Sequence, residues 1–342
     1  MQVVTSDFVS GKKVLLRYDI DVAVGEGTGG RLQVTEDFRL KVGLPTLKLC
    51  LENARETIIF GHLGRPNGED PDFSVAPIYE WLAYQEDLRS HLESGKLKLL
   101  ENLRFEKGED EASLDYAKQL ASYGEVYVME AFAAHHPAAS TTVLPTLLPH
   151  AAGLNFFKEV EKLREIRENP KKPLVVIIGG VKIEDKLPAI EAMSKIADHV
   201  LVGGKIASEI TTYDAIAHQV VMVASLTEDG LDITQATVDS WVRIIRTAGM
   251  ILWNGPLGRI SNFQYPISNE EELGSEKGSF LIAQAILQSK AEVILGGGDT
   301  IAALNKWDLL DQFQAKGFVS TGGGAMLKLL ETGTLPTIEA LE

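Results

Sequence analysis

The sequence of 342 residues contains a single cysteine, Cys50. One thiol can form neither an internal disulfide nor a metal site built from several thiolates, so both are excluded. Basic residues are also scarce: lysine and arginine number 33 against 48 aspartate and glutamate residues, a formal net charge of −15. Nucleic acids and anionic membranes attract basic surfaces, so we expect neither as a partner. Any basic pocket in this chain must be local.

Long apolar runs are missing as well. None reaches the roughly 20 residues that a membrane-spanning helix needs, and charges between Asp7 and Asp21 interrupt the apolar core that a signal peptide would carry. These absences predict a cytoplasmic protein. Hydrophobic residues nevertheless make up 45% of the chain, and its length allows two domains that each bury a core.

Two common phosphate-binding motifs are absent. No G-x-G-x-x-G follows the first apolar run, which counts against a dinucleotide-dependent dehydrogenase. The stretch Gly203-Gly204-Lys205 is followed by Ile206 and lacks the upstream glycine of a Walker A loop. The sequence also shows no Ser/His/Asp set and no histidine cluster of the metal-hydrolase type. Neither nucleophilic hydrolysis nor metal-dependent hydrolysis is therefore indicated.

What the sequence does contain is an alternation of short apolar runs and helical patterns. The expected strands are residues 14–16, 57–60, 97–100 and 126–128 in the first half, and 175–178, 200–202, 250–253, 293–295 and 318–319 in the second. Helices are expected over residues 40–53 and 76–92, for example. An amphipathic helix over residues 155–169 ends at Pro170, and we expect it to be a rigid connector between domains. This order predicts parallel α/β sheets with ligands at the carboxyl ends of the strands.

The five apolar runs of the second half share one feature: each passes directly into small residues. In residues 291–306, AEVILGGGDTIAALNK, a strand, a glycine turn and a helix follow one another. Glycines let the backbone approach phosphate oxygens, and a helix start offers unpaired N–H groups. Asp299 would repel phosphate unless a cation such as Mg²⁺ lies between them. The alternative is that Asp299 or Thr300 merely caps the helix.

Two groups of basic residues point to anions. Lys182 and Lys186 lie four residues apart at an expected helix start, on one face, where they oppose the helix dipole unless an anion lies between them. The alternative is an exposed charged turn. In the first half, basic residues stand at or near the ends of the expected strands: Arg17, Arg39, His62, Arg65 and Arg104. Guanidinium groups bind phosphate and carboxylate, and the alternative for each is a solvated surface charge. A nucleotide cleft with Mg²⁺ and a second cleft for a small anion fit phosphoryl transfer.

These residues resemble the phosphoglycerate kinase family, collinearly over nearly the whole chain. VLLRYDIDV at residues 14–22 is similar to the family's R-x-D-x-N strand, and FGHLGRP at 60–66 is similar to its S-H-L-G-R-P signature. ENLRF at 101–105 is identical to a family motif, and EAF at 130–132 stands where D-A-F is usual. In the second half GGVKIEDK, WNGP, GGGDT and STGGGA follow in the family's order.

The resemblance implies two Rossmann-like three-layer α/β domains with parallel sheets, joined by a long interdomain helix and closing on a hinge. Residues 1–153 would bind 3-phosphoglycerate and residues 154–170 would form the helix. Residues 171–332 would bind nucleotide, and the tail, residues 333–342, would pack back toward the N-terminal domain. The implied reaction is Mg²⁺-dependent phosphoryl transfer between 1,3-bisphosphoglycerate and ADP, giving 3-phosphoglycerate and ATP, in glycolysis and by a monomer.

The resemblance also implies the site residues. Arg39 and Lys186, with backbone N–H groups of Gly322, Gly323 and Gly324, would stabilise the transferring phosphoryl group. The glycerate ligand would contact Asp19, Asp21, Arg39, His62, Leu63, Gly64, Arg65 and Arg104. The nucleotide would contact Lys182, Lys186, Gly203, Gly204, Asn254, Pro256, Gly297, Gly298, Asp299 and Thr300, and Asp299 would hold the Mg²⁺.

Departures from the family pattern concentrate on the substrate side. After Phe132 the family usually continues with H-R-A-H; here Pro137 replaces the arginine that grips the substrate phosphate, and Ala139 replaces the second histidine. Losing one charge-assisted hydrogen bond costs roughly 1.5–3 kcal/mol. Asp21 replaces the usual asparagine, and Ser261 the ribose-binding glutamate. Two alternatives therefore stay open: a kinase for a different acyl phosphate, and a catalytically weakened nucleotide-binding protein of the same fold.

Overall fold

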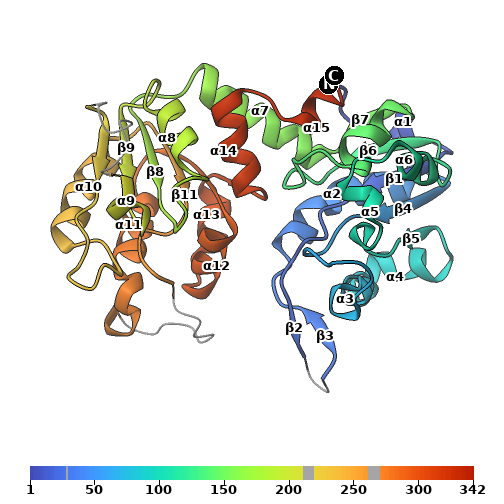
Figure 1. The fold of residues 1–342 in the computed structure, drawn as a ribbon, viewed down its shortest axis with the longest axis horizontal. Helices are drawn as coiled ribbons and strands as arrows, with labels where there is room; N and C mark the ends of the chain where they lie inside the picture. Colours follow the sequence, from blue (N-terminus) through green and yellow to red (C-terminus); the bar gives the residue numbers. More distant parts are fainter. Residues whose placement is uncertain (28–29, 211–218, 261–269) are drawn as a thin grey trace. The chain divides into compact units, whose positions relative to one another are not determined.

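The computed structural model describes residues 1–27, 30–210, 219–260 and 270–342. The chain forms two compact units (Figure 1). Unit 1 comprises Met1–Glu161 together with Thr334–Glu342, and unit 2 comprises Lys162–Gly333. Each unit is built around its own parallel sheet, so the predicted fold class, two parallel-sheet α/β domains, is confirmed. In the described part of the chain, no helix is both long and apolar enough to cross a bilayer.

The sheet of unit 1 has five parallel strands in the order β5-β4-β1-β6-β7. Their bounds are β1 Lys13–Arg17, β4 Glu56–Phe60, β5 Leu97–Leu99, β6 Val126–Met129 and β7 His150–Ala152. The four expected strands are present, and β7 was not expected. A short antiparallel hairpin, β2 (Val24–Glu26) and β3 (Leu32–Val34), was also not expected. Their residues, HAA, VGE and LQV, contain at most two large apolar side chains each, so the sequence gives little strand signal there.

Helices cover the sheet of unit 1 and complete its core. They are α1 Ser6–Val9, α2 Phe38–Asn53, α3 Ala76–Tyr84, α4 Glu86–Glu93, α5 Lys107–Asp110, α6 Leu114–Ala121 and α15 Pro336–Glu339. The prediction of one helix over 76–92 is wrong, because Gln85 is extended (ψ 115°) and separates α3 from α4. Leu82 and Leu88 both enter the core. Six residues apart, they would face different directions on one continuous helix, so the break allows both to be buried.

The sheet of unit 2 has six parallel strands in the order β10-β9-β8-β11-β12-β13. Their bounds are β8 Leu174–Ile178, β9 His199–Val202, β10 Val221–Val223, β11 Met250–Asn254, β12 Glu292–Gly296 and β13 Phe318–Ser320. The five expected strands are present, and β10 was not expected. All five residues of β8 and of β11 are buried, as the continuous apolar runs require.

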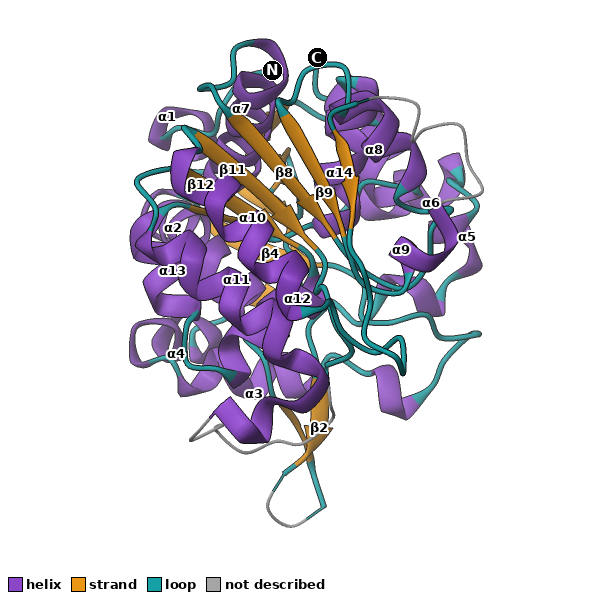
Figure 2. Ribbon diagram, turned by 90° about the vertical axis from the view of Figure 1, so that its left-hand side faces the viewer, coloured by secondary structure: helices purple, strands orange, loops and turns teal. Residues whose placement is uncertain are grey.

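Helices lie on both faces of this sheet (Figure 2). They are α8 Leu187–Met193, α9 Ile206–Glu209, α10 Gln235–Thr247, α11 Lys277–Gln288, α12 Gly298–Lys306, α13 Leu310–Lys316 and α14 Gly323–Thr332. Helices α8 and α14 pack against each other on one face, while α10, α11 and α13 form the layer on the other. The strands therefore end at one edge of the sheet, where the glycine turns that follow β8, β9, β11, β12 and β13 come together.

Helix α7 (Leu154–Glu168) forms where the sequence predicts a helix over 155–169. Its first residues belong to unit 1 and its remainder to unit 2. Its start is held by side chains: Thr46 accepts a hydrogen bond from the Leu154 N–H (2.8 Å), and Glu130 accepts from the Asn155 (3.2 Å) and Phe156 (3.4 Å) N–H groups. The carboxyl oxygens of Glu130 thus satisfy N–H groups that have no partner within the helix.

Candidate functional site

A cavity of about 280 Å³ in unit 1 collects most of the predicted basic residues. Arg17, His62, Arg65 and Arg104 all line it, together with Asp21 and Gly64. They come from the ends of β1 and β4 and from the turn after β5. Residues 133–138, which follow β6, close the lining on another side. The predicted convergence of these four basic residues at one sheet edge is therefore present.

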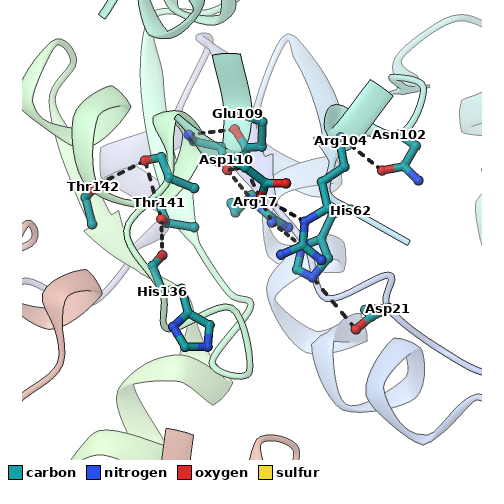
Figure 3. A network of polar contacts seen from close by, with 12 residues as sticks. Arg17, Asp21, His62, Asn102, Arg104, Glu109, Asp110, His136, Thr141 and Thr142 are labelled. Carbon is teal, nitrogen blue, oxygen red and sulfur yellow. Dashed lines mark hydrogen bonds and ion pairs between the residues drawn. The ribbon is translucent and has the colours of Figure 1, made fainter. Parts of the chain in front are cut away.

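Arg17 is the most deeply buried of these cations, with 1% of its surface exposed. Its guanidinium donates to Ser140 Oγ (2.8 Å), to the Tyr18 carbonyl (3.1 Å) and to His62 Nδ1 (2.7 Å). Ser140 in turn donates to Glu109 Oε1 (2.5 Å), and this carboxylate oxygen lies 4.0 Å from Arg17 (Figure 3). Glu109 and Ser140 were missed from the sequence. Both are remote in the chain from Arg17, and no local pattern connects them.

This network fixes the protonation of His62. A guanidinium can only donate, so His62 Nδ1 must accept and the ring proton is on Nε2. Burial, and after it the neighbouring cations Arg17, Arg104, Arg39 and Arg65, hold the pKa of His62 well below its usual range. The Nε2 atom lies 3.7 Å from Asp21 Oδ2. His62 is therefore a neutral N–H donor at neutral pH and adds no charge to the cavity.

The turn after β4 is tied to the same cavity by backbone contacts. Gly64 donates its N–H to Asp21 Oδ1 (2.8 Å), and its carbonyl accepts from the Arg104 guanidinium (2.7 Å). Gly64 has a φ of +61°, a conformation that disfavours a side chain. Leu63, predicted as a substrate contact, is buried and exchanges two hydrogen bonds with the Asn102 side chain, so it does not line the cavity.

Asp19 and Arg39 form a neighbouring group outside the cavity lining. Arg39 lies 3.9 Å from Asp19 Oδ1 and 3.7 Å from Asp21 Oδ2, and donates to the Asp21 carbonyl (2.5 Å). Burial raises the pKa of Asp19, and the Arg39 cation opposes that rise. Among the described residues, Asp19 Oδ2 is a buried acceptor for which no hydrogen-bond donor is present. A buried acceptor of this kind can receive a hydrogen bond from a ligand hydroxyl.

In unit 2, the ends of β11 and β13 position Lys186. The Lys186 ammonium donates to Asn254 Oδ1 (2.6 Å), and the Asn254 amide donates to the Gly323 carbonyl (3.2 Å). Asn254 is fully buried, so its amide holds the lysine at a fixed point beside the start of α14. Burial lowers the pKa of Lys186, while Asp185 and Asp299 oppose that change. Lys186, Asn254, Gly323 and Asp299 are thus brought together.

The glycine turns after β12 and β13 meet at the same place. A Cβ on Gly323 would lie 2.3 Å from Gly297 Cα, so only glycine fits there. Gly297 itself has a φ of +110° and is the N-cap of α12. The alternative that Asp299 or Thr300 caps this helix is wrong: no side chain caps it, and Thr300 Oγ1 instead accepts from the Gly255 N–H (2.8 Å). Asp299 is left exposed in the first turn.

The prediction that Lys182 and Lys186 share one helix face is wrong. Helix α8 begins at Leu187 with Lys186 as its N-cap, and Lys182 is exposed in the turn before it. Proline at position 188 explains the late start, because it lacks an N–H and is favoured in the first helical turn. The remaining predicted nucleotide residues, Gly203, Gly204, Pro256 and Gly298, lie at the carboxyl ends of β9, β11 and β12. Ser261 lies outside the described residues.

No metal site preformed from protein groups is present among the described residues: no three His, Cys, Asp or Glu side chains gather in the required way. Mg²⁺ needs only one or two carboxylates when substrate phosphates supply the other oxygens. The exposed Asp299 carboxylate fits that limited requirement. A separate cavity of about 260 Å³ beside Asp232 and Lys277 contains none of the predicted nucleotide residues.

The family model described as phosphoglycerate kinase matches residues 4–221 and 208–333. Phosphoglycerate kinases from two strains of Leptospira biflexa serovar Patoc are each 32% identical over 398 aligned positions, covering 97% of this chain and 96% of the relative. The structure of phosphoglycerate kinase from Coxiella burnetii is 31% identical, has a TM-score of 0.77 and covers 97% of this chain and 96% of its own. That from Pyrococcus horikoshii OT3 is 24% identical with a TM-score of 0.80, covers 100% of this chain and 98% of its own, and supports the fold.

These matches extend over nearly the whole of both units, and they include the strand ends that carry the two groups of candidate residues. A family model that covers most of the chain and relatives above 30% identity agree with the motifs read from the sequence. The chain belongs to the phosphoglycerate kinase family of kinases.

Proposed function

We propose that this chain catalyses reversible, Mg²⁺-dependent phosphoryl transfer between 1,3-bisphosphoglycerate and ADP, with the carboxyl group of 3-phosphoglycerate as acceptor in the reverse direction. The proposal includes action in glycolysis as a cytoplasmic monomer, with the hinge closure that the family resemblance implies. The observation that carries it is the position of Lys186, whose ammonium is held by Asn254 beside two glycine turns at helix starts. Phosphoryl transfer depends on such positioning of charge rather than on a covalent nucleophile.

In unit 2, the chain's own groups would hold the nucleotide phosphates and stabilise the transferring group. The N–H groups of Gly297 to Thr300 and of Gly322 to Gly324 belong to helix starts, which favour anions. Lys186 would neutralise charge on the transferring phosphoryl group, and the family resemblance implies the same role for Arg39 of unit 1. Asp299 would hold Mg²⁺, which supplies charge neutralisation for the phosphates when it is bound.

In unit 1, the cavity would bind 3-phosphoglycerate. Arg65 and Arg104 carry charge that suits its phosphate or carboxylate, and the His62 Nε2–H can donate to an oxygen. The buried Asp19 Oδ2 would accept from the substrate hydroxyl, which would satisfy this acceptor. Asp21 and Gly64 would act mainly by holding one another in place at the cavity wall.

The test is ATP-dependent turnover of 3-phosphoglycerate, coupled to a dehydrogenase and followed as NADH loss. We expect turnover in the full chain and its loss in Lys186→Ala and Asp299→Ala. Lys195→Ala is the matched control. Lys195 is exposed just after the end of α8 and has no place in the proposed site. Absence of turnover at millimolar substrate, with Mg-ATP still bound, would overturn the proposal. A panel of other acyl phosphates would then separate a kinase of different specificity from a weakened nucleotide-binding protein.

A further inference from the structure

Asn102 is a buried side chain between two of the turns that build the cavity of unit 1. It follows β5, has 2% of its surface exposed and does not line the cavity. The amide oxygen accepts from the N–H groups of Leu63 (3.2 Å) and Arg104 (3.1 Å). The amide nitrogen donates to the carbonyls of Leu63 (2.8 Å) and Phe73 (2.9 Å). Because donors face the oxygen and acceptors face the nitrogen, only one orientation of the amide fits.

These bonds join segments that are remote in the sequence. Leu63 belongs to the turn after β4, one residue after His62 and two before Arg65. Arg104 belongs to the turn after β5, and Figure 3 shows it beside Asn102. Since His62, Arg65 and Arg104 all line the cavity, the amide fixes the backbone that carries them from both sides. One buried side chain thus sets how far apart these two turns stand.

The turn after β4 is also held from its other side. A Cβ on Gly64 would lie 2.3 Å from Phe73 Cε1, so the Phe73 ring lies directly against this turn. Asn102 holds the Phe73 carbonyl, and the Arg104 guanidinium donates to the Gly64 carbonyl (2.7 Å). The amide therefore stands at the point where three segments of unit 1 meet. Its loss would release the turn from both Phe73 and Arg104.

We propose that Asn102 is a positioning residue, which places Arg65 and Arg104 for the phosphate group of 3-phosphoglycerate without touching that ligand. The inference rests on the proposed function, because it takes 3-phosphoglycerate as the ligand. Both guanidinium groups stand at the ends of long side chains, so the fold controls them chiefly through their backbone. A site that is formed before its ligand arrives loses less free energy to ordering when the ligand binds.

A positioning role and a purely structural role have different kinetic consequences. The phosphate group of 3-phosphoglycerate is not the reacting group, so its contacts stabilise the bound substrate and the transition state alike. Misplacing those contacts raises the KM for 3-phosphoglycerate and leaves kcat and the KM for Mg-ATP unchanged. A loss of stability alone lowers the folded fraction, which lowers the apparent kcat and leaves both KM values unchanged.

The experiment compares Asn102→Ala with the wild type in the coupled assay and by isothermal titration of the full chain with 3-phosphoglycerate. Displacement of a binding group by about 1 Å can cost on the order of a hundredfold. We expect the KM and Kd for 3-phosphoglycerate to rise by about ten- to a hundredfold. The titration stoichiometry reports the folded fraction separately from the Kd. Asn102→Ser keeps an acceptor for the Arg104 N–H and is expected to show a smaller rise.

Asn53→Ala is the matched control. The Asn53 amide also belongs to unit 1, but it donates to the Leu49 carbonyl (2.8 Å) in the last turn of α2 and does not line the cavity. We expect this variant to keep the wild-type KM and Kd. In the Asn102 variants, the Leu103 N–H can still donate to the Gly61 carbonyl (3.0 Å), so one backbone bond between the two turns remains.

The outcomes separate the two proposals. An unchanged Kd for 3-phosphoglycerate in Asn102→Ala, with turnover in the wild type, would overturn this inference and leave the proposed function standing. An equal rise in the KM for Mg-ATP would also overturn it, because the effect would then not be confined to unit 1. A wild type that neither binds nor turns over 3-phosphoglycerate would overturn both. A rise confined to 3-phosphoglycerate, smaller in Asn102→Ser and absent from Asn53→Ala, would support the inference.

Discussion

Arg17→Met is the substitution that most directly tests the network beneath the cavity. Methionine has a similar length but neither charge nor N–H donors, so Ser140 Oγ and His62 Nδ1 each lose their donor. Glu109, with 1% of its surface exposed, loses the cation that lies 4.0 Å away. The substitution therefore leaves a buried carboxylate without a compensating charge.

The expected cost follows from that burial. Breaking a buried ion pair by removing one partner typically destabilises a protein by about 3–5 kcal/mol. An exposed pair is worth only about 0.2–1 kcal/mol. Arg55 provides the comparison, because it pairs with Glu125 at 2.8 Å while both side chains are at least half exposed. We expect Arg17→Met to cost several times more than Arg55→Met, a large part of a total stability that is usually about 5–15 kcal/mol.

Hydrogen exchange followed by mass spectrometry in increasing urea is the suitable assay, because it reports unit 1 by its own peptides. A second substitution, Glu109→Gln, made in the Arg17→Met background should recover part of the loss, since it removes the uncompensated charge. NMR titration should also show a higher pKa for His62, which no longer accepts from a cation. If Arg17→Met costs no more than Arg55→Met, the buried network does not stabilise unit 1 and the reasoning is refuted.

Three other predictions follow from the site and from α7. Asn254→Ala should lower kcat/KM for phosphoryl transfer by roughly ten- to a hundredfold, because Lys186 loses a charge-assisted hydrogen bond worth about 1.5–3 kcal/mol; the coupled assay measures this, and an unchanged value would contradict it. Asp299→Asn should raise the Mg²⁺ concentration for half-maximal rate, measured by titration at fixed ATP, and an unchanged dependence would remove Asp299 from the metal site. Burial raises the pKa of Glu130 from 4.5 to about 8. Its contribution to stability is therefore fully present below about pH 4.5 and is lost as pH rises to about 8. Glu130→Gln should reduce that slope in melting curves from pH 5 to 9, and an unaltered slope would refute this assignment.

The sheets and their functional edge could be predicted because one local signal specifies them. Strands buried on both faces are continuous apolar runs, and glycine turns mark where they end. Strand β7 consists of a histidine and two alanines, and β10, although apolar, is not followed by a glycine turn. The break at Gln85 has no glycine or proline to announce it, because it arises from the burial of Leu82 and Leu88 against the rest of unit 1. Tertiary packing decides such breaks.

The prediction for the lysine pair was wrong, although the sequence contains a signal that could have corrected it. A separation of four residues places two side chains on one helix face only if the helix already includes both. Pro188 marks the first turn of α8, which puts Lys182 outside the helix. The position of Lys186 beside Asn254 could not be predicted, because a bond over 68 residues of sequence depends on how β8 and β11 pair.

The burial of Arg17 shows the general limit of the sequence. Arg17 and Arg65 both follow an apolar run, yet one is buried among acceptors and the other is exposed at the cavity rim. The difference arises from Ser140, which lies 123 residues away in the sequence, accepts from Arg17 and donates to Glu109. Residue type therefore predicts that a cation will stand at this edge, and only the packing decides whether it binds a ligand or positions its neighbours.

The two substrate-side departures from the family, at residues 21 and 137, therefore have different consequences. Asp21, in place of the usual asparagine, adds a negative charge, but its carboxylate accepts from the Gly64 N–H and lies 3.7 Å from Arg39. Its charge is therefore opposed within unit 1 itself. Nothing comparable compensates for the change to Pro137, since a proline offers neither a charge nor an N–H donor. The change at residue 137 thus alters the electrostatic balance of the cavity more than the change at residue 21 does.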